Sequence, residues 1–337
     1  MAELLRTAPL PTPAKEAAQL KVGHGRANGK DADKPSDIPA AGWWAILKRV
    51  AQQISADRVI TEAGAVTFFS LLAIFPAIAA LISLYGLFAD PRNVSEHLAV
   101  MDGLLPGGGL DIIKDQVKSL TSGEPKALGF GVLIGFGTSL WSANQGVKAL
   151  FDALNIVNDE KESRGFLYRT VLTLSFTLGA LLFILLALGA VVVVPAVLAF
   201  VGLGDVLEFV LRFARWPLLL TAIGLFLALI YRYGPSREAA KWRWISWGSA
   251  FAAVAWVIGS AGFSWYVANF GSYNKTYGSL GAVVGFMTWI WISTIIILIG
   301  GELNAEIEHQ TDRDTTTGPE QPQGKRGAVK SDNSAPA

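Results

Sequence analysis

The sequence predicts an all-α, polytopic membrane protein with about six transmembrane helices and short amphipathic helices at the membrane interface. Two observations support this prediction. Of the 337 residues, 52% are hydrophobic and only 16% are charged, whereas soluble domains typically carry about 25% charged residues. The charge deficit is concentrated in long apolar runs, each near the ~20 residues that a helix needs to cross a bilayer.

The composition also excludes several classes of function. There is no cysteine, which excludes disulfides, thiolate metal sites and thiol catalysis. The three histidines, His24, His97 and His309, are far apart in the sequence, so no pair has the spacing of two metal ligands on one helix. We therefore expect no metal and no cofactor. A net charge of +1 provides no strong field for a nucleic-acid partner, and none is expected.

The two ends of the chain are polar. Residues 1–41 are rich in Ala, Pro, Lys, Gly and Asp, and residues 311–337 in Thr, Gly, Pro, Gln, Lys and Ser. Segments with so little apolar surface cannot offset the entropy cost of ordering. They are therefore predicted to be disordered cytoplasmic tails.

A short amphipathic helix is predicted between the first tail and the first span. Over residues 42–53, Trp44 and Leu47 alternate at helical spacing with Lys48 and Arg49. Tryptophans beside cations suit a helix that lies in the headgroup layer, which is the favoured interpretation. The alternative is an ordinary helix packed under the bundle.

Six apolar stretches then define a membrane domain over residues 42–310. They cover residues 63–88, 128–149, 171–201, 216–233, 245–270 and 280–301. The second is the weakest prediction because its glycines lower its hydropathy. Pro76 and Pro195 permit kinks in the first and third stretches.

The distribution of basic residues predicts the orientation. Of the 28 lysines and arginines, 21 fall on the side that carries both termini and 7 on the other. Cytoplasmic segments carry the excess of basic residues, so both termini are predicted to be cytoplasmic. The loop on the opposite side, about residues 89–127, contains Leu110, Ile113, Val117 and Leu120 at helical spacing, which predicts a second amphipathic helix.

Polar residues of the second stretch share one helix face. Asn144, Lys148, Asp152 and Asn155 recur at helical spacing, with Gln145 beside them. Such a face avoids lipid and looks into the bundle or into a wet cavity. It either contacts a solute or an ion, or only forms a hydrogen-bond network between helices. Lys148 and Asp152 are one turn apart and can pair.

The sixth stretch ends in a second polar group, formed by Glu302, Asn304 and Glu306. Glu302 directly follows an apolar run, so its carboxyl group needs either a cation or a proton. Four arginines near helix ends of the same side are candidate partners, namely Arg58, Arg164, Arg169 and Arg232. Glu302 is then either a proton-coupled or gating carboxyl group, or one half of a structural salt bridge.

The turn between the last two stretches, residues 270–279, is short, polar and aromatic. Tyr273 and Tyr277 can anchor it at the membrane interface, and Asn274 adds a polar group. An anchored turn is the default interpretation, and a gate or ligand-binding turn is the alternative.

Several ordered polar motifs resemble the YihY/BrkB family of bacterial inner-membrane proteins. They lie at Trp141–Gly146 and Ala153–Asn155, with Glu162 and Arg164 following, and then at 242–244, 266–284 and 301–306. The resemblance covers about residues 43–308. It implies six spans in the bacterial inner membrane. Members of the family have been labelled ribonuclease BN, linked to serum resistance, and suggested to act in export or lipid-related transport.

The favoured function is transporter-like, the movement of a lipid or small solute along a path lined by the polar residues named above. The alternative is a non-enzymatic scaffold or envelope-integrity factor. Besides the bilayer, partners would be a lipid or small solute, and a homo-oligomer is compatible with the sequence. An enzyme is not expected, and ribonuclease activity least of all, because no clustered metal ligands and no paired acid and base beside a basic surface are present.

Overall fold

The computed structural model describes residues 28–85, 113–115, 117–118, 130–201, 205–270 and 279–335. Six long helices dominate these ranges: α3 (Val59–Tyr85), α6 (Phe130–Val157), α7 (Phe166–Val201), α8 (Asp205–Tyr233), α9 (Trp242–Phe270) and α11 (Ser279–Gln310). Within the same ranges the only β-type pairing is an isolated bridge between Ala240 and Thr316. The prediction of an all-α fold is confirmed.

Five of these helices are long and apolar enough to cross a membrane. The qualifying segments are Val59–Leu81, Phe166–Ala187, Trp216–Tyr233, Trp242–Asn269 and Val283–Gln310. The prediction of a polytopic membrane protein is therefore confirmed. Helix α6, the weakest predicted span, is not among the five, because glycines and polar residues dilute its apolar run.

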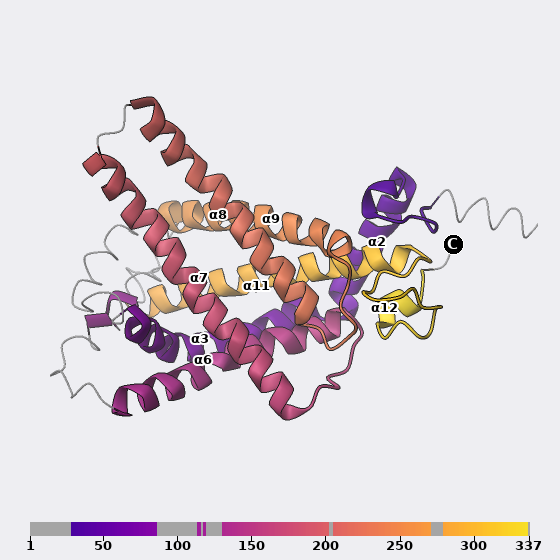
Figure 1. Ribbon diagram of the computed structural model, residues 1–337, viewed down its shortest axis with the longest axis horizontal. Helices are drawn as coiled ribbons and strands as arrows, with labels where there is room; N and C mark the ends of the chain where they lie inside the picture. Colours follow the sequence, from indigo (N-terminus) through magenta and orange to yellow (C-terminus); the bar gives the residue numbers. More distant parts are fainter. Residues whose placement is uncertain are drawn as a thin grey trace, which may run out of the picture.

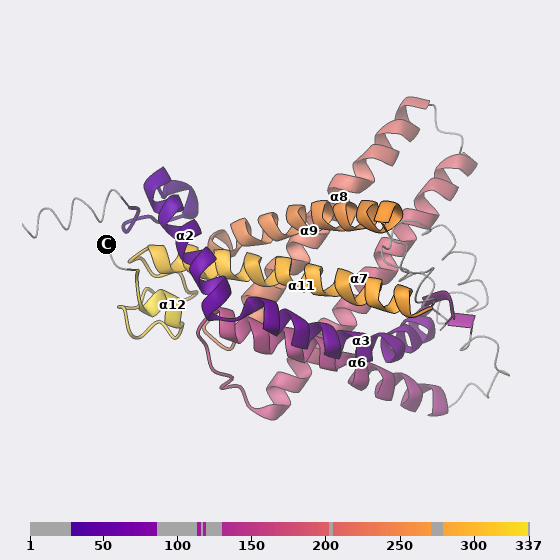
Figure 2. The same cartoon turned by 180° about the vertical axis from the view of Figure 1, so that it is seen from behind.

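Helix α6 is nevertheless an integral part of the bundle, since it runs alongside α3 (Figure 2). Small residues allow this close approach. A side chain on Gly146 would meet the Ser70 hydroxyl at 3.3 Å and the Ala73 methyl at 3.7 Å. Helices in lipid associate through such close packing rather than through a hydrophobic driving force.

Helices α7 and α8 form a hairpin whose far end, at Val201 and Asp205, diverges from the other long helices (Figure 1). Apolar side chains on this hairpin are exposed, including Leu186 at 74% and Leu218 at 68%. Exposed leucines are expected where a helix faces lipid. Toward the opposite end, α6, α8 and α11 converge on a buried core that contains Phe151, Leu227 and Leu298.

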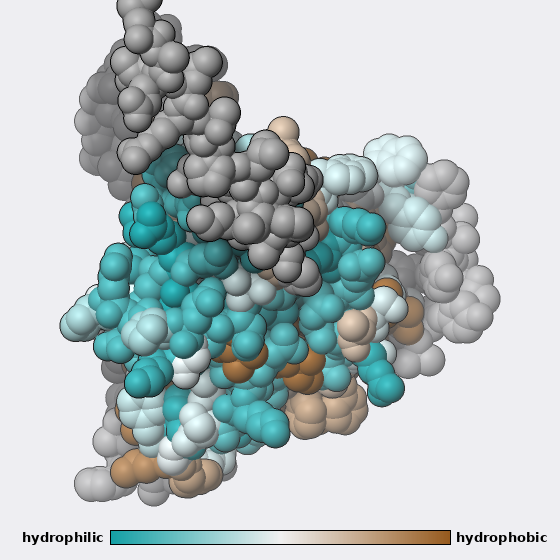
Figure 3. All heavy atoms as spheres, turned by 90° about the vertical axis from the view of Figure 1, so that its right-hand side faces the viewer, coloured by the Kyte–Doolittle hydropathy of each residue, from teal (hydrophilic) through white to brown (hydrophobic). Residues whose placement is uncertain are grey.

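That opposite end carries most of the polar structure, and we call it the charged end. It comprises α2 (Ala40–Ala56), the 3₁₀ turn η1 (Pro35–Asp37), α12 (Val329–Asp332) and the loops 158–165 and 234–241. The described residues of both terminal segments lie there (Figure 1). Its outer surface is mainly hydrophilic (Figure 3).

Helix α2 has one face packed on the bundle and another face exposed, so it has features of both predicted arrangements, the packed helix and the interfacial helix. Ile46 and Val50 are buried in a cluster with Trp244 of α9 and Ile307 of α11. On its other side Trp44 is 73% exposed and Leu47 is half-exposed. One face thus packs on the bundle, and the other presents apolar groups suited to a membrane interface. Of the second predicted amphipathic helix, residues 113–115 and 117–118 are helical and Val117 is buried, and the rest lies outside the described residues.

The structure differs from the prediction of two disordered tails. Residues 28–41 and 311–335 are packed against the charged end, whereas 1–27 and 336–337 lie outside the described residues. The backbone N–H of Asp312 donates to the Lys30 carbonyl at 2.8 Å, and the Thr311 hydroxyl donates to the Ala32 carbonyl at 2.8 Å. The guanidinium of Arg326 donates to the carbonyls of Asp312, Arg313, Gln321 and Ser331. Hydrogen bonds and ion pairs, together with the burial of a few apolar side chains such as Ala32 and Ile38, order these segments. Composition alone does not reveal such specific contacts.

Candidate functional site

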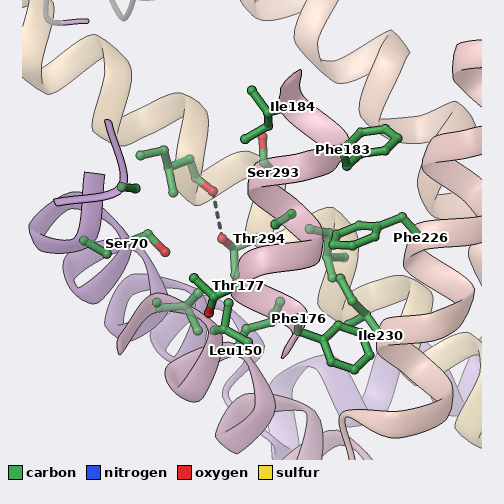
Figure 4. A pocket seen from close by; sticks show the side chains of 18 of the residues that line it. Ser70, Leu150, Phe176, Thr177, Phe183, Ile184, Phe226, Ile230, Ser293 and Thr294 are labelled. Atoms are coloured by element: carbon green, nitrogen blue, oxygen red, sulfur yellow. Dashed lines mark hydrogen bonds between the residues drawn. The ribbon is translucent and has the colours of Figure 1, made fainter. Parts of the chain in front are cut away.

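A partly open cavity of about 500 Å³ lies between the helices and is lined by side chains from all six long helices. Its walls are mostly aliphatic and aromatic. Figure 4 shows Leu150 of α6, Phe176, Phe183 and Ile184 of α7, and Phe226 and Ile230 of α8 among the lining side chains. Phe183 and Phe226 stack with their ring centroids 5.5 Å apart. The cavity therefore offers a predominantly apolar surface.

A few hydroxyl groups also line the cavity, and most of them have partners in the protein. The Thr294 hydroxyl donates to the Ile290 carbonyl at 2.9 Å (Figure 4). The Ser293 hydroxyl accepts a hydrogen bond from the Trp256 indole at 3.0 Å. These groups can orient a bound molecule but provide no charge to recognise one.

Asn144 lies directly behind the cavity wall. It is fully buried, and its side-chain oxygen accepts a hydrogen bond of 3.0 Å from the hydroxyl of Thr177, which lines the cavity. The side-chain amide nitrogen of Asn144 has no hydrogen-bond partner within the described ranges. Of the predicted polar face, Asn144 is thus the member associated with the cavity.

The middle of that face is arranged differently from the prediction. Gln145 is exposed. The ammonium of Lys148 lies 4.9 Å from the centre of the Trp141 ring, a cation–π geometry. Asp152 pairs with Arg169 of α7 at 2.6 Å, so the predicted Lys148–Asp152 pair is wrong. A guanidinium from the neighbouring helix provides a planar donor array that a lysine on the same helix cannot match.

Asn155, at the end of the same face, joins two loops of the charged end. Its side-chain oxygen accepts a hydrogen bond of 2.6 Å from the backbone N–H of Ser236, and its side-chain amide lies 3.4 Å from the Glu162 carboxylate. Glu162 pairs with Arg164 at 2.7 Å. Hydrogen bonds from Arg164 lower the pKa of Glu162 from 4.5 to about 2. This arrangement holds the loops together rather than facing a solute.

Glu302 is fully buried, yet neither of its carboxyl oxygens has a hydrogen-bond donor among the described residues. The predicted arginine partners bind elsewhere, which corrects that expectation. Arg164 pairs with Glu162, Arg169 with Asp152, and Arg232 donates to the Ala240 carbonyl. Arg58 is exposed and makes no ion pair with Glu302. The side chain that faces Glu302 is another carboxyl group, that of Asp57 in the turn between α2 and α3.

Glu306, one turn further along α11, is by contrast fully paired. It lies 2.6 Å from Arg49 of α2 and 3.0 Å from Lys330 of α12. Lys330 also pairs with Asp159 at 2.9 Å. Burial by itself lowers the pKa of Lys330, but Glu306 and Asp159 outweigh this effect, and the pKa is raised.

Asn304 stabilises the crossing of α9 and α11. Its side-chain oxygen accepts a hydrogen bond of 2.8 Å from the backbone N–H of Gly248. A side chain on Gly248 would lie well inside van der Waals distance of the Gly300 carbonyl oxygen. The two helices therefore approach each other closely here, and Asn304 is a structural residue.

Several polar residues of the charged end escaped the sequence analysis, namely Asp57, Asp159, Arg237, Glu308 and Lys330. Glu308 lies only two residues after Glu306 but on another face of α11, so the row of Glu302 and Glu306 does not indicate it, and nothing local indicates the others. The candidates Tyr273, Asn274 and Tyr277 lie outside the described residues. In the part of the chain that the structure describes, no group of three or more His, Asp or Glu side chains is arranged to hold a metal ion.

The sequence was compared with protein families and with known proteins. The model of the virulence factor BrkB family matches residues 50–325. The ribonuclease-like protein YfkH of Bacillus subtilis is 28% identical over 264 residues, which is 77% of this chain and 94% of that protein. UPF0761 membrane proteins of Vibrio campbellii and Cronobacter sakazakii are 27% and 29% identical over 277 residues, which is 80% of this chain in both cases and 84% and 89% of those proteins. No solved structure matches. Because the family model spans most of the sequence, this chain belongs to the virulence factor BrkB family.

Proposed function

We propose that this membrane protein is a transporter that moves a lipid or another small amphiphilic solute, and that the cavity within the bundle receives its apolar part. The observation that carries the proposal is the apolar space of about 500 Å³ between all six long helices. Pockets that bind small molecules commonly measure about 300–1,000 Å³ and are lined mainly by apolar side chains. The cavity is partly open rather than sealed, so the hydrocarbon part of a lipid can enter it and contact its apolar walls.

The chemistry of the lining indicates the class of solute. Hydroxyl groups such as those of Thr177 and Thr294 are the main polar groups on the walls, and both are already hydrogen-bonded. A charged solute would lose its hydration there without compensation. We therefore assign the cavity to a hydrocarbon portion, with any charged headgroup left outside it.

The proposal also includes the membrane in which the protein lies and the side of that membrane that its charged end faces. The chain would lie in the bacterial inner membrane with the charged end in the cytoplasm, which the 21-to-7 distribution of basic residues supports. We propose no enzymatic activity. The ribonuclease-like name belongs to the Bacillus relative, and RNA cleavage by the purified protein, abolished by a point substitution, would overturn this part of the proposal.

A scaffold or envelope-integrity role is the second candidate, and one observation favours it. The charged end is fastened by buried ion pairs, of which Arg237–Glu308 is the most buried, and a scaffold requires only such a stable surface. A scaffold role predicts that filling the cavity has no effect on activity in cells.

Lipid movement in reconstituted vesicles distinguishes the two functions. Fluorescently labelled phospholipid in proteoliposomes should exchange between leaflets faster with the protein than without it. Ala180→Phe, which fills the cavity, should slow this exchange roughly tenfold, because its ring occupies space that the acyl chain needs. A tenfold change in rate corresponds to about 1.4 kcal/mol in the barrier. Leu186→Phe on the same helix is the control, because Leu186 is 74% exposed. Equal rates for the two variants, or no exchange with the parent protein, would reject the proposal.

A further inference from the structure

Two carboxyl groups face each other at the charged end, and no basic side chain of the described residues forms an ion pair with either of them. Glu302 extends from α11 and is 0% exposed, and Asp57 lies in the turn between α2 and α3. Both carboxyl oxygens of Glu302 and one of Asp57 are buried without a hydrogen-bond partner in the described segments. Buried polar atoms are almost always hydrogen-bonded, so three adjacent acceptors without a protein donor favour a site that binds a proton or a cation.

The cations nearby are engaged by other carboxylates. Lys330 of α12 lies between Glu306 and Asp159, at 3.0 and 2.9 Å. Arg49 of α2 lies 2.6 Å from Glu306. The imidazole of His309, which is not counted among these cations, lies 3.4 Å from the same carboxylate. The pair is thus bordered by two carboxylates that are already neutralised and by cations already in use. Its own negative charge is not balanced by a contact ion pair.

Two ionised carboxylates in contact in a buried site repel strongly, and one proton removes the repulsion. The proton converts one group into a donor and forms a short O–H···O hydrogen bond to the other. We propose that Asp57 and Glu302 form a proton-binding site in which the two carboxyl groups share one proton. This inference goes beyond the proposed transport function and does not depend on it.

The position of Asp57 supports this assignment. Burial raises the pKa of Asp57, and the nearby Asp159 carboxylate raises it further. Asp57 is only partly buried, so a proton can reach the two carboxyl groups from the aqueous side of the charged end. Loss of the proton would leave two negative charges between the α2–α3 turn and α11, and would favour their separation.

Infrared difference spectroscopy of the purified full-length protein in lipid nanodiscs tests the site. Near neutral pH the parent protein should show the C=O stretch of a protonated carboxylic acid, shifted in deuterated water. Glu302→Gln should remove one such band, and Asp57→Asn should shift or remove it. Glu162→Gln is the matched control, because Glu162 is ionised at this pH by its pairing with Arg164.

Each outcome of this experiment is decisive. Loss of the band in Glu302→Gln with retention in Glu162→Gln supports the site. A band that is unchanged in Glu302→Gln overturns it, because the protonated carboxyl group then belongs to another residue. A band that appears only without sodium, and vanishes when sodium is added at constant pH, also overturns it and shows a metal-cation site. Thermal unfolding of each variant checks that the fold is retained.

Discussion

The guanidinium of Arg237 and the carboxylate of Glu308 lie 2.6 Å apart, and both side chains are almost completely buried. This pair ties the loop between α8 and α9 to the last turn of α11. The second carboxylate oxygen of Glu308 accepts a hydrogen bond from Thr315, so the C-terminal segment is joined to the same point.

Removing one member of this pair should destabilise the protein markedly. Glu308→Ala leaves the Arg237 charge buried and unpaired, a change that costs about 3–5 kcal/mol. The midpoint of thermal unfolding in detergent should therefore fall substantially. The double variant Arg237→Met, Glu308→Leu should recover much of the loss, and a double variant as unstable as the single one would contradict the assignment.

The Glu162–Arg164 pair should contribute to the acid stability of the loops. The folded-state pKa of Glu162 is lowered from 4.5 to about 2. Its stabilisation is therefore present above pH 4.5 and is lost as the pH falls through that range toward 2. Unfolding followed as a function of pH should show a steeper loss for the parent protein than for Glu162→Gln. Parallel curves would show that the pair is not linked to folding.

Lys330 should hold the C-terminal segment on the charged end. Lys330→Ala removes the contacts to both Glu306 and Asp159, at 3.0 and 2.9 Å. Residues 311–335 should then become accessible to a nonspecific protease much faster than in the parent protein. Lys325→Ala, at an exposed position of the same segment, is the control and should leave the cleavage rate unchanged.

The crossing of α9 and α11 should tolerate no side chain at Gly248. Gly248→Ala would press a methyl group against the Gly300 carbonyl and the Asn304 side chain, at a cost of ~1–3 kcal/mol. Gly262→Ala on the same helix meets nothing within 4 Å, and alanine stabilises helices relative to glycine by about 1 kcal/mol. The two variants should shift the unfolding temperature in opposite directions, and equal shifts would contradict the packing described.

The membrane helices could be predicted from the sequence because hydropathy acts locally. Each predicted stretch corresponds to a long helix, and the glycine-diluted second stretch is the one that falls short of a membrane span. The partners of polar residues could not be predicted in the same way. Arg169 outcompetes Lys148 for Asp152 from another helix, and no spacing rule within one helix reveals that.

The candidate site shows the same difference between properties that follow from a residue's own helix and contacts that depend on how separate helices pack. That Asn144 avoids lipid followed from the polarity of its helix face, but its association with Thr177 depends on how α6 and α7 pack. The apolar run before Glu302 predicts that its carboxyl group is withdrawn from water, and its 0% exposure agrees with this prediction. That the facing group is Asp57, about 250 residues earlier in the chain, is a consequence of the fold.

Photocrosslinking with a lipid that carries a reactive group on its acyl chain tests the central claim most directly. After reconstitution and illumination, the modified residues are identified by mass spectrometry. The account predicts adducts on side chains that line the cavity, such as Leu150, Phe176 and Phe226, and their loss in Ala180→Phe. Adducts confined to lipid-facing positions such as Leu186 and Leu218, equally strong in both proteins, would show that no acyl chain enters the bundle.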